Sequence, residues 1–339
     1  MLIGELGEKG LIDRIRKKIL KGSSLKSDVI CGIGDDAAAF KSTEKTTLVT
    51  ADVLVDDVHF VSGTIDGRDL GYKSMAVNVS DIAAMAGLPR YAVISLGIPG
   101  NMEYGFIDSI YEGMIEAGAR FDLQIIGGDT SRSRNLFIDV TIIGDVEPDM
   151  ITKRSTARPG DRIYATGSLG ASGLGLTALK AVSMPYPDAV ERLIKRHLRP
   201  PARVEEGRIL ARAGATSMED ISDGLITDLM HIAEESRVGF MLQEELIPID
   251  IDVLKNSLAV SGKKPLELAL YGGEDYELIC TGPEGLIAEY EKRANQNEVV
   301  ELSEIGMILD RDKGCVISGV DGRVSQVTDL GYDHFKRYE

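Results

Sequence analysis

The stretch TTLVTADVLV, residues 46–55, reads as a β-strand. Its side chains alternate, so Thr50 and Asp52 lie on one face while Ala51 and the neighbouring valines lie on the other. The strand therefore carries a hydroxyl group and a carboxylate on the same face. This arrangement makes Asp52 a candidate ligand of a metal ion.

Helices and further strands surround this strand in the first half of the chain. Residues 11–20 have apolar side chains at helical spacing, and residues 70–87 read as a buried helix that Asp69 is placed to cap. A further helix is expected at 103–121, and strands are expected at 91–99, 123–126 and 136–146.

The composition of the sequence changes at residues 147–161, where two prolines occur and apolar residues are few. We place a domain boundary here, which gives domains at 1–147 and 148–339. Strands are expected at 162–167, 276–282 and 315–320, and helices at 171–183, 203–213 and 224–236. Helices and strands in both halves predict an α/β or α+β chain with two sheets.

Composition narrows the class of function. The 339 residues include 54 acidic and 38 basic ones and carry a net charge of −16, which argues against nucleic acid as a partner. The sequence has no apolar run long enough to span a bilayer and no signal-peptide core at its start. We therefore expect no membrane partner and a cytoplasmic location. Its three cysteines form no CxxC pair, so neither a disulfide framework nor a structural zinc site is expected.

Common catalytic motifs are missing from the sequence. It has no GxxxxGK[ST] phosphate loop, no HExxH helix, no GxSxG elbow and no HRD/DFG kinase set. The glycine-rich stretch at 166–176 fits neither the phosphate-loop nor the dinucleotide spacing, and it reads as a tight turn.

The positive signal is a recurring pattern in which glycine or small residues accompany an aspartate at the end of a strand or the start of a helix. It occurs at Gly34-Asp35-Asp36, Thr50-Ala51-Asp52, Ser80-Asp81, Gly127-Gly128-Asp129, Asp220-Ile221-Ser222-Asp223 and, as a related case, GGED at 272–275. A single aspartate of this kind is usually a turn former or a helix cap. Six in one chain predict a cluster that binds magnesium, because converging carboxylates repel one another unless cations bind.

The histidines are less informative. His59 follows the strand that holds Asp52, and a structural role and a substrate contact are equally expected for it. Core or surface roles are expected for His197 and His231.

These residues belong to segments that resemble the thiamine-monophosphate kinase family, of the superfamily that includes aminoimidazole ribonucleotide synthetase. The resemblance runs end to end and in order. The matching segments are GELGEKGLIDRI (4–15), GIGDDAA (32–38), TADVLVDDVHF (50–60), GYKSMAVNVSDIAAMAGLP (71–89), IIGGDT (125–130), KRSTARPGD (153–161), GSLGASGLGL (167–176), RHLRPPAR (196–203), DISDGL (220–225), LYGGEDYEL (270–278) and LGYDHF (330–335).

The resemblance implies a fold and a set of functional residues. It implies the two-domain fold of aminoimidazole ribonucleotide synthetase, with an N-terminal domain that binds ATP and magnesium and pairs its sheet with a second copy into a barrel. The C-terminal domain would complete the active site. The positions that match magnesium ligands are Asp36, Thr50, Asp52, Asp81, Asp129, Asp220 and Asp223. Those around ATP are Tyr111, Gly128, Asp129, Arg154 and Ser222, and those on the substrate side are His59, Glu274 and Tyr332. Ala51 departs from the family, in which a hydroxyl residue is common.

The implied reaction is magnesium-assisted, in-line transfer of a phosphoryl group from ATP to thiamine monophosphate. Asp52, Asp81, Asp129 and Arg154 would carry the catalysis, several magnesium ions would bind, and the protein would be a homodimer. Two alternatives stay open at this point. One is another ATP-using enzyme of the same superfamily, and the other is a non-catalytic sensor of nucleotide or metal.

Overall fold

The computed structural model describes residues 3–22, 27–31, 39–42, 44–181, 187–294 and 298–327. The chain divides into two compact units. Unit 1 comprises Met1–Ile82 and Gly87–Pro148, and unit 2 comprises Ala83–Ala86 and Asp149–Glu339. No helix among the described residues is both long enough and apolar enough to cross a membrane.

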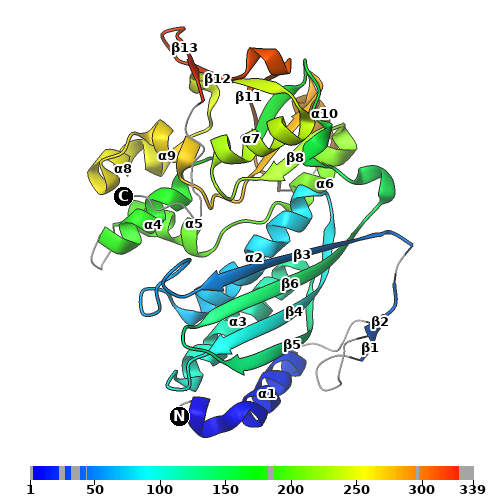
Figure 1. Cartoon of the computed structure of the whole chain (residues 1–339), viewed down its shortest axis with the longest axis vertical. Coiled ribbons are helices and arrows are strands. Elements are labelled where there is room, and N and C mark those ends of the chain that lie inside the picture. Colours follow the sequence, from blue (N-terminus) through cyan, green and yellow to red (C-terminus); the bar gives the residue numbers. More distant parts are fainter. Residues whose placement is uncertain are drawn as a thin grey trace. The chain divides into compact units, whose positions relative to one another are not determined.

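Unit 1 is built on a four-stranded sheet in the order β3-β6-β4-β5 (Figure 1). The strands are β3 (Thr46–Val55), β4 (Leu88–Ile98), β5 (Gln124–Arg132) and β6 (Phe137–Val146). Strand β6 is antiparallel to both of its neighbours, whereas β4 and β5 are parallel. Strands β3 and β5 therefore form the two edges of the sheet. A short ladder of β1 (Val29–Cys31) and β2 (Ala39–Phe40) lies outside this sheet.

Two helices, α2 (Gly67–Ala84) and α3 (Tyr104–Phe121), cover one face of this sheet (Figure 1). Helix α1 (Ile3–Gly22) packs against α3 and β5. The helices α2 and α3 approach closely at glycines, since a Cβ at Gly71 would lie 1.9 Å from the carbonyl oxygen of Ile110. Burial of this face confirms the predicted alternation of β3, because Leu48 and Leu54 point toward the helices.

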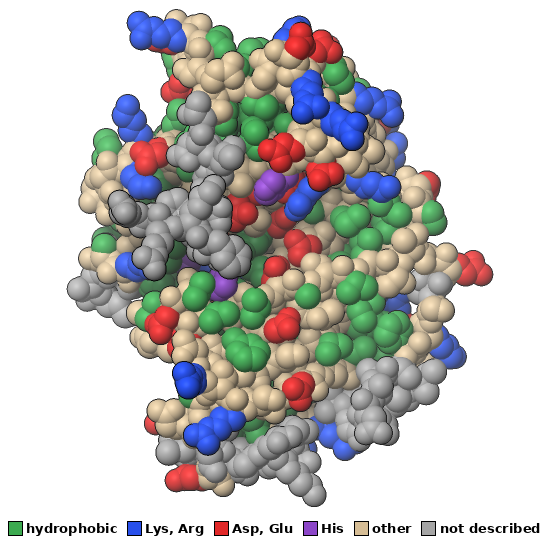
Figure 2. All heavy atoms as spheres, in the orientation of Figure 1, with side chains coloured by type: hydrophobic (Ala, Val, Ile, Leu, Met, Phe, Trp, Pro, Cys, Tyr) green, Lys and Arg blue, Asp and Glu red, His purple; other side chains and the backbone are tan. Residues whose placement is uncertain are grey.

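The opposite face of the sheet is open in the described chain and partly apolar. Val49 is 66% exposed and Val53 is 44% exposed, and both lie on this face of β3. Figure 2 shows hydrophobic side chains gathered over the sheet of unit 1.

Two expectations for unit 1 need correction. Asp69 is not the cap of the second helix, because α2 begins at Gly67 and the N–H of Arg68 donates to the Asp66 carboxylate over 2.7 Å. The strand expected at 123–126 is longer, since pairing with β4 continues to Arg132.

Unit 2 contains a seven-stranded mixed sheet in the order β13-β12-β9-β11-β7-β10-β8. The strands are β7 (Arg162–Thr166), β8 (Ser217–Asp220), β9 (Gly239–Gln243), β10 (Leu278–Gly282), β11 (Leu302–Leu309), β12 (Cys315–Ser318) and β13 (Val324–Gln326). Together with the sheet of unit 1, this confirms the mixed α/β prediction with sheets in both halves.

Helices cover both faces of the sheet of unit 2. Helices α7 (Leu225–Ser236) and α9 (Pro265–Tyr271) contribute to the core on one face, where Ile163 and Phe240 are buried. Helices α6 (Val204–Ala213) and α10 (Leu286–Ala294) contribute to the core on the other, around Tyr164. Helices α4 (Ala171–Ala181), α5 (Asp188–Leu198) and α8 (Ile251–Ser261) form a separate cluster with α9. The single-turn helices are η1 (Pro148–Met150), η2 (Arg154–Thr156), η3 (Glu244–Leu246) and η4 (Arg311–Lys313).

Candidate functional site

Two segments of unit 2 are joined by backbone hydrogen bonds. The DISDGL segment (220–225) connects β8 to α7, and the GGED segment (272–275) lies between α9 and β10. The backbone N–H of Glu274 donates to the carbonyl oxygen of Ser222 over 2.7 Å. The structure thus brings a predicted substrate residue into direct contact with a predicted ATP residue.

The contact between these segments depends on unusual backbone angles. Glu274 has φ of 56° and Tyr276 has φ of 50°, a left-handed conformation that non-glycine residues rarely adopt. Gly273 has φ of 66°, and a Cβ there would lie 3.0 Å from the carbonyl oxygen of Ser222. Glycine is therefore required where the two segments approach most closely.

A buried histidine holds the side chain of Glu274. The Nδ1 atom of His197 lies 3.3 Å from Glu274 Oε2 and 3.0 Å from the Oγ atom of Ser172. The histidine is only 3% exposed. The sequence predicts a core or surface role for this histidine, which belongs to the RHLRPPAR segment (196–203).

Two arginines of the same RHLRPPAR segment bind the residue that follows the GGED segment by two positions. Arg203 donates two hydrogen bonds to the Glu277 carboxylate, from Nε to Oε2 at 2.7 Å and from Nη2 to Oε1 at 2.6 Å. Arg196 Nη2 donates a third, to Oε1, at 2.8 Å. Glu277 is completely buried, so its charge is compensated by these bonds and by Thr166. The RHLRPPAR segment therefore holds the chain in place directly after the GGED segment.

Asp275, also in the GGED segment, has a structural role. Its carboxylate accepts hydrogen bonds from the backbone N–H groups of Gly170 and Ser172. Complete burial raises the pKa of Asp275 to about 7. This aspartate anchors the start of α4 to the GGED segment.

A cluster of charged side chains lies beside the DISDGL segment. His231 Nδ1 is 2.9 Å from Glu219 Oε1 and 3.8 Å from Asp228 Oδ1, and Arg154 Nη2 is 2.9 Å from Glu219 Oε1. The other oxygen of Asp228 accepts hydrogen bonds from the backbone N–H groups of Asp223 and Gly224. Figure 2 shows acidic side chains, a histidine and basic side chains together on this part of unit 2.

Burial and mutual repulsion perturb this cluster. Burial raises the pKa of Glu219, and burial together with repulsion from Glu219, Asp220 and Asp223 raises the pKa of Asp228 well above its usual range. The hydrogen bond to Glu219 raises the pKa of His231. The predicted ligands Asp220 and Asp223 therefore lie close to a second set of acidic groups.

Asp223 is not the cap of α7 that its position before the helix suggests. The N-cap residue is Gly224, and the turn is held by the Asp228 carboxylate from inside the helix. The Asp223 carboxylate is thereby available for another role beside Ser222.

In unit 1 the structure brings two of the predicted ligands together. The Oγ1 atom of Thr50 on β3 donates to Asp81 Oδ2 on α2 over 2.5 Å. Asp52 follows two residues later on β3 and lies on the same face as Thr50. The hydrogen bond between Thr50 and Asp81 therefore joins β3 to α2 through side-chain oxygens.

Asp129 lies at the other edge of the same sheet. The strand register places Asp52 beside Val140, Val140 beside Ile94, and Ile94 beside Gly128. Three strand spacings separate the two edges, which is roughly 14 Å. Within one copy of the chain, Asp129 and Asp52 do not meet.

The remaining predicted residues have varied environments. Tyr111 on α3 is buried, and this burial raises the pKa of its phenol. His59 accepts a hydrogen bond at Nδ1 from the backbone N–H of Val55 over 3.1 Å, which fixes its ring beside the end of β3. Gly128 packs against the backbone of Ile94. Asp36 and Tyr332 lie outside the described residues.

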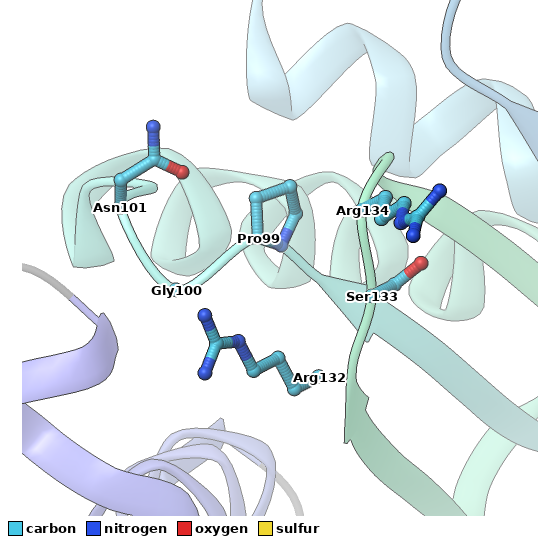
Figure 3. Close-up of a pocket in the computed structure, with 6 residues that line it drawn as sticks. All are labelled: Pro99, Gly100, Asn101, Arg132, Ser133 and Arg134. Carbon is cyan, nitrogen blue, oxygen red and sulfur yellow. The ribbon is translucent and has the colours of Figure 1, made fainter.

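A cavity of about 710 Å³ opens in unit 1 where β4 and β5 end (Figure 3). Its lining comprises Pro99, Gly100, Asn101, Arg132, Ser133 and Arg134. The Arg132 side chain extends beneath Gly100, whereas Arg134 points in another direction, so the two guanidinium groups do not converge (Figure 3). None of the predicted site residues that the structure describes lines this cavity.

Comparison with known proteins identifies the family. The chain matches the family models described as AIR synthase related protein, N-terminal domain, at residues 34–146 and AIR synthase related protein, C-terminal domain, at residues 158–318. Thiamine-monophosphate kinase of Bacillus subtilis (strain 168) is 37% identical over 318 residues, which cover 91% of this chain and 95% of the relative. The chain belongs to the thiamine-monophosphate kinase family.

Solved structures of the thiamine-monophosphate kinase family have the same fold. The crystal structure of thiamine-monophosphate kinase from Stenotrophomonas maltophilia K279a matches with a TM-score of 0.80 and 32% identity, covering 93% of this chain and 96% of that one. The structure described as AaThiL complexed with AMPPCP and TMP matches with a TM-score of 0.77 and 34% identity, covering 99% of each chain.

In this member of the thiamine-monophosphate kinase family, the sequence pattern did not indicate the cluster of charged side chains beside the DISDGL segment. Glu219, Asp228 and His231 were not proposed as site residues. Asp228 and His231 are three residues apart on α7, a spacing that places them on one helix face and could have linked them to the aspartates nearby. The role of His197 beside Glu274 was also missed, because sequence alone does not show which segments meet.

Proposed function

We propose that this protein transfers the γ-phosphoryl group of ATP to thiamine monophosphate, which yields ADP and thiamine diphosphate. The observation that carries the proposal is the hydrogen bond between Glu274 and Ser222, because the family resemblance assigns the first to the substrate and the second to ATP. Membership of the thiamine-monophosphate kinase family supports the same reaction. The relative described as complexed with AMPPCP and TMP supports both reactants.

Magnesium is the cation that fits the proposed ligands, since all of their side chains offer oxygen atoms. The proposed ligands are Asp36, Thr50, Asp52, Asp81, Asp129, Asp220 and Asp223. The contact between Thr50 and Asp81 supports a shared role for this pair. Ala51 has no side-chain oxygen, so its backbone carbonyl is the only ligand that this position could supply. Bound magnesium would neutralise phosphate charge and favour in-line geometry.

The proposed nucleophile is a terminal phosphate oxygen of thiamine monophosphate. A phosphate monoester has a second pKa of about 6, so this oxygen is largely deprotonated near neutral pH. It forms a bond to the γ-phosphorus while the bond to the bridging oxygen breaks and ADP leaves. We therefore assign no histidine or carboxylate as an essential proton acceptor.

The chain supplies binding and orientation for this transfer. Arg154 is half exposed and pairs with Glu219, and we assign its guanidinium to the phosphates of ATP, which it would bind in place of that carboxylate. Tyr111 and Gly128 complete the proposed ATP contacts. Glu274, held by His197, and His59 are assigned to thiamine monophosphate. Tyr332 is assigned to stacking on the cationic thiazolium ring.

We further propose a homodimer in which the open faces of two unit 1 sheets pack together and close into a barrel. The exposed valines of β3 support this arrangement, because an apolar sheet face favours burial. Closure would pair edge β3 of one copy with edge β5 of the other. Asp52 would then lie near the partner's Asp129, which it does not meet within one chain.

A cytoplasmic location also stays a prediction.

A coupled assay of ADP release tests the proposed reaction. We expect ADP release that depends on thiamine monophosphate and magnesium, with thiamine diphosphate formed in equal amount. Nucleotide binding without turnover would instead support the sensor alternative. Turnover that ignores thiamine monophosphate but responds to another acceptor would indicate a different activity within the superfamily.

A further inference from the structure

The strongest unassigned feature of the molecule is the group formed by Glu219, Asp228 and His231. Glu219 lies at the end region of β8, and the other two side chains lie on α7. Each residue offers one ligand atom that lies within 4.8 Å of the other two. None of the three belongs to the proposed magnesium ligands.

Two atoms of this group lack a hydrogen-bond partner although they are buried. Among the residues that the structure describes, Glu219 Oε2 and Asp228 Oδ1 accept no hydrogen bond, and their side chains are only 2% and 1% exposed. Buried carboxylate oxygens without partners are costly, so such atoms are rare unless a cation or water completes them. Asp228 Oδ1 points into the group, since the His231 ring nitrogen lies 3.8 Å from it.

Several carboxylates also lie close to Asp228. The carboxylates of Glu219, Asp220 and Asp223 repel that of Asp228, and Arg154 and His231 both contact Oε1 of Glu219. A divalent cation would bind the two carboxylate oxygens that have no partner among the described residues, Glu219 Oε2 and Asp228 Oδ1.

The spacing of the ligand atoms matches a small coordination sphere. Bonds of about 2.0 to 2.2 Å to a tetrahedral zinc ion separate the ligand atoms by roughly 3.4 Å. The distance from His231 Nδ1 to Asp228 Oδ1, 3.8 Å, is near this value, and a carboxylate oxygen of Glu219 lies within 4.8 Å of both atoms. An imidazole ligand favours zinc and similar metals over magnesium.

We propose that Glu219, Asp228 and His231 form a separate metal site that binds one zinc-type divalent cation and leaves its fourth position to water. The ion would connect β8 to α7 across the DISDGL segment. It would thereby fix the backbone that carries Asp220, Ser222 and Asp223. This inference does not depend on the proposed kinase reaction.

The test uses the full-length protein with magnesium in excess and Co²⁺ as a spectroscopic substitute for zinc. We expect one equivalent of Co²⁺ to bind and to give the intense visible absorption of a tetrahedral site with a nitrogen ligand. His231→Gln and Asp228→Asn should each abolish that absorption, whereas His59→Gln in unit 1 should retain it. Added Zn²⁺ should raise the Tm of the wild-type protein but not that of the His231→Gln variant.

Absence of Co²⁺ binding to the wild-type protein would overturn the proposal, and this result needs no variant. Binding that persists unchanged in His231→Gln would also overturn it. His231 is 38% exposed, so its replacement should not open the core, and circular dichroism can verify that this variant folds. ADP release with magnesium alone reports on the kinase proposal separately.

Discussion

The backbone N–H of Glu274 donates a hydrogen bond to the carbonyl oxygen of Ser222, and both residues lie in segments that glycines allow to approach closely. A main-chain bond of this kind makes the position of one segment depend on the other. The proposed substrate contact and the proposed nucleotide contact are consequently parts of one unit of structure.

Replacement of Gly273 by alanine should impair both substrates together. The new Cβ would lie 3.0 Å from the Ser222 carbonyl oxygen, and φ of 66° disfavours alanine in any case. We expect kcat/KM to fall on the order of tenfold or more for both ATP and thiamine monophosphate, because both contacts are displaced. Gly262→Ala is the matched control, since Gly262 has φ of 69° but open space around it. An effect on only one substrate would show that the segments move independently.

His197 should control the affinity for thiamine monophosphate through Glu274. We compare His197→Asn, whose side-chain amide keeps a donor near the Nδ1 position, with His197→Leu, which keeps none. We expect the leucine variant to raise KM for thiamine monophosphate while KM for ATP changes little. The asparagine variant should recover most of that loss. Equal effects of the two variants on KM would mean that His197 acts only by filling space.

Mixing two inactive variants should restore activity if the site is shared between copies. Asp52→Asn and Asp129→Asn should each abolish turnover with magnesium, whereas His59→Gln should retain much more of it. After the two variants are unfolded and refolded together, about a quarter of wild-type activity should return, because half of the dimers are hybrids and each hybrid holds one intact site. No recovery, with hybrids demonstrated by mass, would show that each chain carries its own complete site.

The stability of the protein should depend on pH through Asp275. Its pKa is raised from 3.8 to about 7 in the folded protein, so the unfolded chain loses this proton first as pH rises. The stabilising effect of the protonated group is present below pH 4 and is lost by pH 7. The free energy of unfolding of Asp275→Asn should therefore rise relative to wild type by roughly 4 kcal/mol across this range. Urea unfolding at several pH values measures it.

Asp252 provides a control of opposite sign for that measurement. The hydrogen bond from Arg192 lowers the pKa of Asp252, so its contribution to stability is lost as pH falls. The difference between Asp252→Asn and wild type should consequently shrink toward acid pH. If the difference in free energy of unfolding between Asp275→Asn and wild type did not change with pH, the carboxyl group of Asp275 would titrate normally in the wild-type protein.

Much of the fold could be predicted where local pattern and burial agree. The alternation of residues 46–55 gave the correct bounds of β3, because one face packs on helices and the other is open. Strands such as β8 and β9 were missed, since runs of only four or five residues are too short to give a clear periodic signal. The start of α2 was misplaced because Asp66 and Asp69 are both acceptable caps in sequence, and only the backbone shows which one accepts from Arg68.

Individual residues of the candidate site could be predicted from the sequence, but their positions relative to one another could not. The aspartate pattern singled out Asp220 and Asp223, which do lie beside further acidic groups. It did not indicate that Asp52 and Asp129 occupy opposite edges of one sheet, because strand order is a property of the whole fold. Glu219 was missed because an acidic residue inside a buried strand has no local signal in the sequence.

The separation of Asp52 and Asp129 has a consequence for a newly made chain. If turnover needs both carboxylates at one phosphate, a chain that has folded but not yet met a second copy can bind nucleotide without consuming it. Assembly would then be the event that switches the enzyme on, and dilution would switch it off. Isolated copies would be harmless to the ATP pool of the cell.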